Sequence, residues 1–155
     1  PGDRVRLSGP FGEFHIMDSD REMVFIGGGA GIAPMRSMLL DLLETRQSSR
    51  SISFWYGARN LRELVYRRQF EALASAHDNF RYEVVLSQPE PDTTWTGAVG
   101  LVHKIVHDRY LANHTRPEDA EYYLCGPPLM TAAVLAMLDD LGVDRESIFL
   151  DDFGG

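Results

Sequence analysis

Five short runs of apolar and β-branched residues alternate along the chain with longer segments in which apolar residues recur at helical spacing. The runs cover residues 23–27, 51–56, 81–86, 122–125 and 147–150. Short runs of this kind are typical of buried strands, and strands that alternate with helices are typical of a parallel sheet. The pattern therefore predicts an α/β fold: a five-stranded parallel sheet with helices on both faces, in three α/β/α layers.

The segments between these runs predict four helices. A second helix is expected over residues 61–76 and a third over residues 101–111. The fourth begins at the two prolines 127–128, which suit a helix start, and ends near Gly142, which suits a helix stop. The first helix carries its apolar residues on one stripe, as in a helix that packs on a sheet. These residues are Met35, Met38, Leu39, Leu42 and Leu43.

Composition narrows the class of protein. The 155 residues, 44% of them hydrophobic, suit one globular domain with a core. The formal net charge of −8 argues against a nucleic-acid surface, which needs clustered Lys and Arg. The longest apolar run, within residues 129–138, is shorter than the ~20 residues that a membrane-spanning helix needs. We therefore expect a soluble piece, and the start at Pro1 indicates a domain cut from a longer protein.

The cysteine and histidine residues give little indication of a metal site. Cys125 is the sole cysteine, so this chain by itself forms neither a disulfide nor an iron–sulfur cluster. His103 and His107 have the i, i+4 spacing of a zinc site, but the residues between them lack the glutamate of a zinc-protease helix. We expect a solvated helix face here and predict no metal site.

A glycine-rich segment joins the first run to the first helix and is the strongest chemical signal. Residues 27–31 hold four glycines in five positions. A helix start has unpaired N–H groups and roughly half a positive charge, and glycine lets the backbone approach a pyrophosphate. The Gly-x-Gly-x-x-Gly fingerprint does not fit, because counting from Gly29 its third glycine falls on Pro34. The segment predicts a nucleotide pyrophosphate site of another kind, with a tight structural turn as the alternative.

The carboxyl ends of the predicted strands carry the other unusual clusters of the chain. Ligands of open α/β sheets bind outside these ends. The clusters are residues 28–34, 57–59, 87–89, 125–128 and 151–153. Because the strands are predicted to be parallel, we expect all five clusters to meet along one edge of the sheet.

In their order and spacing these clusters resemble the NAD(P)H-binding half of the ferredoxin–NADP⁺ reductase family, over the whole chain. The resemblance implies a ferredoxin reductase-like NAD(P)-binding domain that binds NADH through the matching residues. These are Gly28, Gly29, Ala30, Gly31, Ile32, Ala33, Pro34, Gly57, Ala58, Arg59, Glu63, Ser87, Gln88, Gly126, Pro127, Pro128 and Met130.

The resemblance also implies roles in catalysis for three residues. Cys125 matches the family cysteine beside the reacting nicotinamide carbon; a buried small apolar residue is the alternative. Phe153 matches the aromatic residue that stacks on the flavin and yields to nicotinamide; an aromatic plug at the sheet edge is the alternative. Asp151 matches a family carboxylate near the flavin.

The same resemblance divides the chain into two parts. Residues 1–14 resemble the last strand and exit of an FAD-binding β-barrel, and residues 15–155 the NADH-binding domain. The flavin motif of the barrel itself is absent, so we expect the fragment to lack flavin and to be inactive alone. In the parent protein NADH would deliver hydride to FAD, which would pass electrons on to a [2Fe–2S] cluster.

Residues 23–37, 53–59, 121–128 and 150–155 are most similar to a respiratory branch of the family that translocates Na⁺ and reduces ubiquinone. This implies a parent with a membrane helix, a [2Fe–2S] domain and an FAD barrel. It would lie with other subunits on the cytoplasmic face of the bacterial inner membrane. Two alternatives remain: the reductase component of an aromatic-ring oxygenase, and a non-catalytic nucleotide-sensing module.

Charge near the third strand indicates which cofactor is used. No Lys or Arg occurs between Tyr82 and His103, whereas Glu90 and Asp92 do. NADPH carries a further phosphate that sites bind with Arg or Lys. We therefore predict NADH. Glu63 is a candidate acceptor for the adenosine ribose hydroxyls, with an ordinary solvated carboxylate at a helix start as the alternative.

Overall fold

A parallel sheet of six strands forms the centre of the computed structural model, which describes residues 2, 4–6, 8, 12–91 and 94–151. Its strand order is β4-β3-β2-β1-β5-β6, and every pairing is parallel. The strands are β1 (Met23–Gly28), β2 (Ile52–Ala58), β3 (Phe80–Leu86), β4 (Ala98–Val99), β5 (Glu121–Cys125) and β6 (Ile148–Asp151). The predicted α/β class is confirmed.

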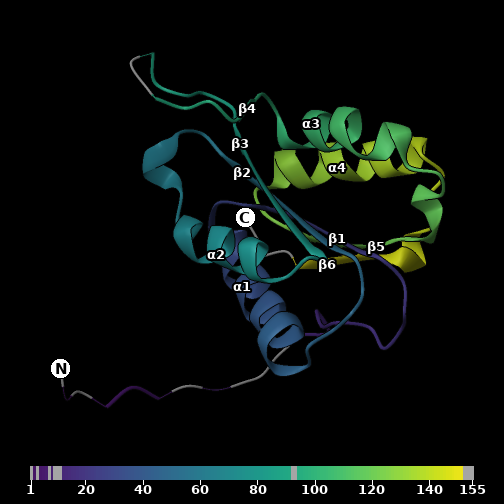
Figure 1. Ribbon diagram of the computed structural model, residues 1–155, viewed down its shortest axis with the longest axis horizontal. Coiled ribbons are helices and arrows are strands. Elements are labelled where there is room, and N and C mark those ends of the chain that lie inside the picture. Colours follow the sequence, from purple (N-terminus) through teal and green to yellow (C-terminus); the bar gives the residue numbers. More distant parts are fainter. Residues whose placement is uncertain (1, 3, 7, 9–11, 92–93, 152–155) are drawn as a thin grey trace.

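Two helices cover each face of the sheet, so the three-layer arrangement is also confirmed (Figure 1). α1 (Ile32–Leu40) and α2 (Arg67–Ala76) lie on one face, and α3 (Val102–Arg109) and α4 (Pro128–Asp140) on the other. The chain winds outward from β1 through β2 and β3, then returns to place β5 on the other side of β1. This reversal of winding is where open α/β sheets bind ligands.

Burial on both faces explains why the strands are almost continuous apolar runs. In β1, Phe25 packs in the cluster under α1 and α2, and its neighbour Ile26 packs in the cluster under α3 and α4. In β5, Tyr123 packs in the cluster under α1 and α2, and Tyr122 in the cluster under α3 and α4. The predicted stripe of α1 is confirmed: Met35 and the leucines are buried, and Met38 packs against them. That helix ends in a π-helical turn over Asp41–Thr45.

The prediction of five strands was wrong by one. The strand that the sequence did not predict is β4. It has two residues, which pair in register with Val85 and Leu86. Two residues cannot establish an alternating pattern, so no sequence signal for it exists. The strand arises because β3 has a free edge that the chain reaches on its way to α3.

The second helix is shorter than predicted. A 3₁₀ turn occupies Leu61–Glu63, and the α-helix begins only at Arg67. Asn60 caps the short turn by accepting a hydrogen bond from the N–H of Arg62 at 3.0 Å. Tyr66 then has a φ of 56°, which no α-helix continues through. The apolar residues of the predicted helix 61–76 therefore belong to two separate elements, the 3₁₀ turn and α2.

The remaining helix predictions agree with the structure. α3 lies within the predicted residues 101–111, and α4 begins at the second proline and ends two residues before Gly142, which has a φ of +73°. Within the described part of the chain, no helix combines the length and apolar character needed to cross a membrane. The division at residue 14 into barrel exit and NADH-binding domain stays a prediction.

Leu39 and Leu129 offer a matched test of the core. Leu39 on α1 is fully buried, and Leu129 on the first turn of α4 is 88% exposed. We expect Leu39→Ala to lower the free energy of unfolding by about 2 to 5 kcal/mol, because it removes buried methyl groups and leaves a cavity. Leu129→Ala is expected to change it by less than about 0.5 kcal/mol. Urea unfolding of both variants measures the difference, and equal losses would contradict this core.

Candidate functional site

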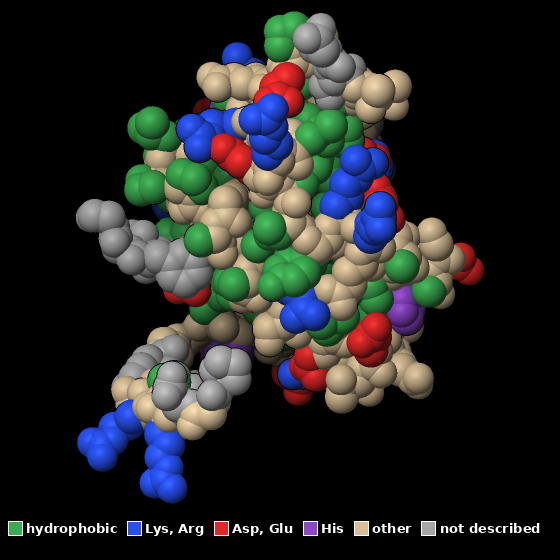
Figure 2. All heavy atoms as spheres, turned by 90° about the vertical axis from the view of Figure 1, so that its left-hand side faces the viewer, with side chains coloured by type: hydrophobic (Ala, Val, Ile, Leu, Met, Phe, Trp, Pro, Cys, Tyr) green, Lys and Arg blue, Asp and Glu red, His purple; other side chains and the backbone are tan. Residues whose placement is uncertain are grey.

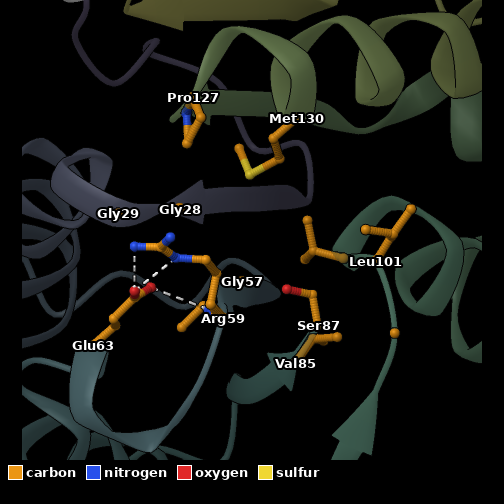
Figure 3. A pocket seen from close by; sticks show the side chains of 13 residues that line it. Gly28, Gly29, Gly57, Arg59, Glu63, Val85, Ser87, Leu101, Pro127 and Met130 are labelled. Atoms are coloured by element: carbon orange, nitrogen blue, oxygen red, sulfur yellow. Dashed lines mark hydrogen bonds and ion pairs between the residues drawn. The ribbon is translucent and has the colours of Figure 1, made fainter. Parts of the chain in front are cut away.

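The carboxyl ends of β1, β2 and β3 open into a cavity of about 350 Å³. The starts of α3 and α4 close its other side, where Leu101, the residue before α3, and Met130 of α4 face it (Figure 3). Nine of the predicted cofactor-binding residues line the cavity. They are Gly28, Gly29, Gly57, Ala58, Arg59, Glu63, Ser87, Pro127 and Met130. Tertiary structure thus brings together residues from four separate segments of the chain.

The other predicted binding residues lie beside the cavity and do not line it. Ala30 and Gly31 complete the 3₁₀ turn after β1, and Ile32, Ala33 and Pro34 form the first turn of α1. Gln88 is exposed on the loop after β3. Gly126 lies between β5 and α4, and Pro128 is the first residue of α4.

Glycine is required at position 31, in the loop after β1, because the loop there lies against the end of β5. A Cβ atom on Gly31 would stand 1.9 Å from the carbonyl oxygen of Cys125. A Cβ atom on Gly28 would stand 2.7 Å from the sulfur of Met130. Gly29 has a φ of +54°, a conformation that glycine adopts without strain. The loop therefore presents bare backbone to the cavity, as contact with a pyrophosphate requires.

Tyr56 supports this loop from inside the protein. Its side chain is buried in β2, and its hydroxyl donates to the carbonyl oxygen of Gly29 at 3.5 Å. Burial, and then the carboxylate of Glu63, raise the pKa of Tyr56, so the hydroxyl stays protonated and able to donate at neutral pH. The turn after β1 is thus tied to the neighbouring strand.

Arg59 lines the cavity and is paired with a carboxylate. Glu63 accepts from the Nε of Arg59 at 2.7 Å and from its backbone N–H at 3.2 Å (Figure 3). The hydrogen bond from Arg59 lowers the pKa of Glu63 and raises the pKa of Arg59. A second pair joins Arg62 to Glu90 at 3.1 Å. Figure 2 shows basic side chains next to acidic ones on this side of the molecule.

The three residues predicted for catalysis lie at the same end of the sheet or beyond the described part. Cys125 is fully buried, packs in the cluster under α1 and does not line the cavity. Asp151 ends β6, is half-buried and pairs in register with Cys125. Phe153 lies outside the described residues. The roles of all three stay predictions.

Four lining residues were missed by the sequence analysis: Val85, Gly100, Leu101 and Val102. The N–H of Gly100 donates to the carbonyl oxygen of Leu86 at 2.9 Å, which fixes the chain at the cavity wall. Gly100 also has a φ of +144°, which side chains rarely allow. Its place directly before a predicted helix was the one available signal.

The histidines of α3 do not form part of a metal cluster. Over the described ranges, no group of three or more His, Cys, Asp or Glu could hold a metal ion. His107 contacts Asp108 at 2.8 Å, and desolvation followed by the charge of Lys104 lowers the pKa of His103.

Comparison with known sequences gives a family and close relatives. Residues 25–135 match the profile of the family described as "Oxidoreductase NAD-binding domain". The F subunit of the Na⁺-translocating NADH-quinone reductase is 58% identical in Yersinia enterocolitica and 57% in Klebsiella pneumoniae, in both over the whole chain. The chain spans 38% of the length of these relatives. The predicted resemblance of the chain to the Na⁺-translocating respiratory branch of the family is confirmed.

Solved structures share the fold. The Amycolatopsis cytochrome P450 reductase GcoB superposes with a TM-score of 0.80 at 27% identity, over 94% of this chain and 42% of that one. The FAD/NAD-binding domain of a Vibrio cholerae nitric oxide dioxygenase superposes with a TM-score of 0.77 at 25% identity, over 94% of this chain and 56% of that one. The ferredoxin reductase of carbazole 1,9a-dioxygenase superposes with a TM-score of 0.69 at 26% identity, over 90% of this chain and 40% of that one. The predicted ferredoxin reductase-like domain is confirmed.

Gly31 tests whether the loop forms the nucleotide site. In Gly31→Ala the new Cβ collides with the Cys125 carbonyl, so the loop and the end of β5 must move apart. We expect the NADH dissociation constant to rise at least about tenfold, or about 1.4 kcal/mol. The measurement is a fluorescence titration with NADH.

Gly142→Ala is the matched control. Its φ of +73° makes alanine strained, at a cost of about 1 to 2 kcal/mol of stability, but no atom lies within 4 Å of the new Cβ. We expect a lower melting temperature and unchanged NADH binding. Wild-type NADH affinity in Gly31→Ala would refute the assignment of the loop.

Proposed function

The chain belongs to the oxidoreductase NAD-binding domain family, and from this premise we propose that it is the NADH-binding domain of a flavoprotein. The parent protein would be the component through which electrons enter a respiratory Na⁺-translocating NADH:ubiquinone reductase. The cavity at the carboxyl ends of β1, β2 and β3 carries the proposal. It joins the bare backbone of Gly28 and Gly29 to apolar walls at the point where the sheet reverses its winding.

The lining suggests how a dinucleotide is held. The backbone of Gly28 and Gly29 takes the pyrophosphate. The adenosine ribose lies toward Ser87 and the Arg59–Glu63 pair, and the nicotinamide lies toward Pro127 and Met130, near the end of β5. Support comes from the position of these residues on opposite sides of the glycine loop (Figure 3). Apolar walls from Val85, Leu101 and Met130 keep water from the bound cofactor.

Flavin would supply the redox chemistry in this proposal, as the acceptor of a hydride from NADH and the donor of single electrons to a [2Fe–2S] cluster of the parent chain. Cofactors carry such chemistry, and the protein aligns them. Cys125 and Gly126 would border the nicotinamide, Asp151 would lie near the flavin, and Phe153 would cover the flavin until nicotinamide displaces it.

The proposed partners are the upstream FAD and [2Fe–2S] domains of the parent chain and the other subunits of a membrane complex. This complex would lie at the cytoplasmic face of the bacterial inner membrane. The names of the relatives support it, as does the 38% of their length that this chain spans. Residues 1–14 would be the exit of the FAD-binding barrel.

A reductase component of an oxygenase is the second candidate. Its support is the structural similarity to the reductases of a cytochrome P450 system and of carbazole dioxygenase, at 26–27% identity. The 57–58% identity of this chain to the Na⁺-translocating relatives outweighs it. Reduction of quinone in membranes that contain the parent protein separates the two.

The proposed reaction is tested in the parent protein loaded with FAD. Under anaerobic conditions, we expect NADH to bleach the flavin absorption and then to produce the paramagnetic signal of a reduced iron–sulfur cluster. Stopped-flow absorption and electron paramagnetic resonance follow the two steps. If NADH binds but the flavin absorption does not change, the chain is a nucleotide-sensing module and the proposal is wrong.

Glu63 is expected to contribute to the preference for NADH. Its carboxylate engages Arg59 and repels a further phosphate, so wild type should bind NADH more tightly than NADPH. Glu63→Gln removes the charge and releases Arg59 for a 2′-phosphate. We expect the ratio of NADPH to NADH affinity to rise about threefold to tenfold, with the effect shrinking as salt is added.

Glu71→Gln is the matched control, because Glu71 pairs with Arg67 at the same i, i+4 spacing and the same 2.6 Å on α2. Glu71 does not line the cavity. The control should leave the ratio unchanged. Equal affinity of the wild type for both cofactors, or the same ratio in both variants, would contradict the charge argument.

A further inference from the structure

Glu121, the first residue of β5, is the one buried acidic side chain in the described part of the chain, at 2% exposure. A carboxylate is stable in such a place only if its charge and lone pairs are matched. Its Oε1 accepts from the hydroxyl of Ser19 at 2.7 Å. Its Oε2 accepts from Arg50 at 2.6 Å and from the hydroxyl of Tyr123 at 2.8 Å. These four residues form a satisfied network, here named the anchor cluster.

The anchor cluster holds the segment that leads into the sheet, residues 14–22. Besides Ser19, the backbone N–H of Met17 donates to the Tyr123 hydroxyl at 3.1 Å. Arg50 donates to two carbonyl oxygens of the same segment, those of Met17 at 3.1 Å and Arg21 at 2.5 Å. The ring of Phe14 meets the edge of the Tyr123 ring. One buried cluster therefore fixes the path of this leading segment.

Arg21 adds a second attachment. Its guanidinium donates to the carbonyl oxygens of Asp119 and Ala120 at 2.7 and 3.0 Å and to the hydroxyl of Ser147 at 2.8 Å. The leading segment is thus bound to the residues just before β5 and β6 as well as to the anchor cluster. Purely apolar contacts would let the segment slide, whereas these hydrogen bonds and the ion pair fix its direction.

A single strand links the anchor cluster to the proposed nicotinamide site. β5 begins at Glu121 and ends at Cys125, and its alternate side chains share one face. At about 3.3 Å per residue, the Cα atoms of these two residues lie roughly 13 Å apart. The strand is central, paired on both sides by β1 and β6, and fully buried. What is fixed at its amino end is therefore fixed relative to the cavity.

We propose that the anchor cluster is a positioning device: it sets the place of the upstream flavin domain relative to the nicotinamide. This inference rests on the proposed function, in which the leading segment continues from the flavin-binding barrel. Hydride transfer requires the nicotinamide carbon and the flavin nitrogen to approach within about 3 to 3.5 Å, and a displacement of about 1 Å can cost about a hundredfold in rate. The cluster acts on that distance without contacting either cofactor.

Tyr123→Phe and Ser19→Ala test the inference, with Tyr122→Phe as the matched control. Tyr122 is the adjacent residue on β5, equally buried, and its hydroxyl donates at 2.8 Å to the carbonyl oxygen of Pro117, outside the leading segment. In the FAD-loaded parent protein, stopped-flow absorption gives the rate of flavin reduction at saturating NADH and the dissociation constant of NADH. Hydrogen–deuterium exchange at the Met17 amide gives a readout that is independent of activity.

We expect both test variants to reduce flavin about tenfold or more slowly than wild type, with the NADH dissociation constant within about twofold. The Met17 amide should exchange faster in Tyr123→Phe. The control should match wild type in all three measurements. This split between rate and binding distinguishes positioning of the flavin from simple support of the cavity.

Three results would overturn the inference. If both test variants reduce flavin as fast as wild type, it is wrong and the proposed function stands. If binding of NADH weakens in parallel with the rate, the cluster supports the cavity and does not position the flavin. If the wild-type parent protein shows no flavin reduction by NADH, the proposed function fails, and this inference fails with it.

Discussion

The close approach of the loop after β1 to the end of β5 is the constraint on which the site depends. A side chain on Gly31 would overlap the carbonyl of Cys125, so only glycine lets these two turns meet. Because they meet, α1, which follows the loop after β1, and α4, which follows β5, begin close to each other. Met130 and Pro127 can then close over Gly28, and the cavity follows from this packing.

The polarity of the parallel sheet separates two tasks. At the carboxyl ends, glycines and backbone groups form a cavity with few charged side chains of its own. At the amino ends, a buried ion pair and several directed hydrogen bonds fix the leading segment. β5 takes part in both, because Glu121 and Cys125 are its two ends. Buried central strands transmit position well, since interiors are close-packed and resist deformation.

The charges around the cavity support the proposed preference for a dinucleotide without a further phosphate. The chain carries a net charge of −8, and Arg59, which lines the cavity, is already paired with Glu63. In the proposed complex, attraction for the pyrophosphate would come from the backbone N–H groups at the helix start, which do not titrate.

The sequence by itself determined the layers, five of the six strands and nine of the thirteen residues that line the cavity. Burial on both faces forces apolar runs, and glycine and proline mark strand-to-helix turns wherever they occur, so these features are local. Tertiary structure alone decided β4, the break at Tyr66 and the walls at Val85 and Leu101, because each depends on what a distant segment presents. The anchor cluster is of the same kind. Ser19, Arg50 and Glu121 are far apart in the chain, and only folding gives a buried carboxylate the partners that it needs.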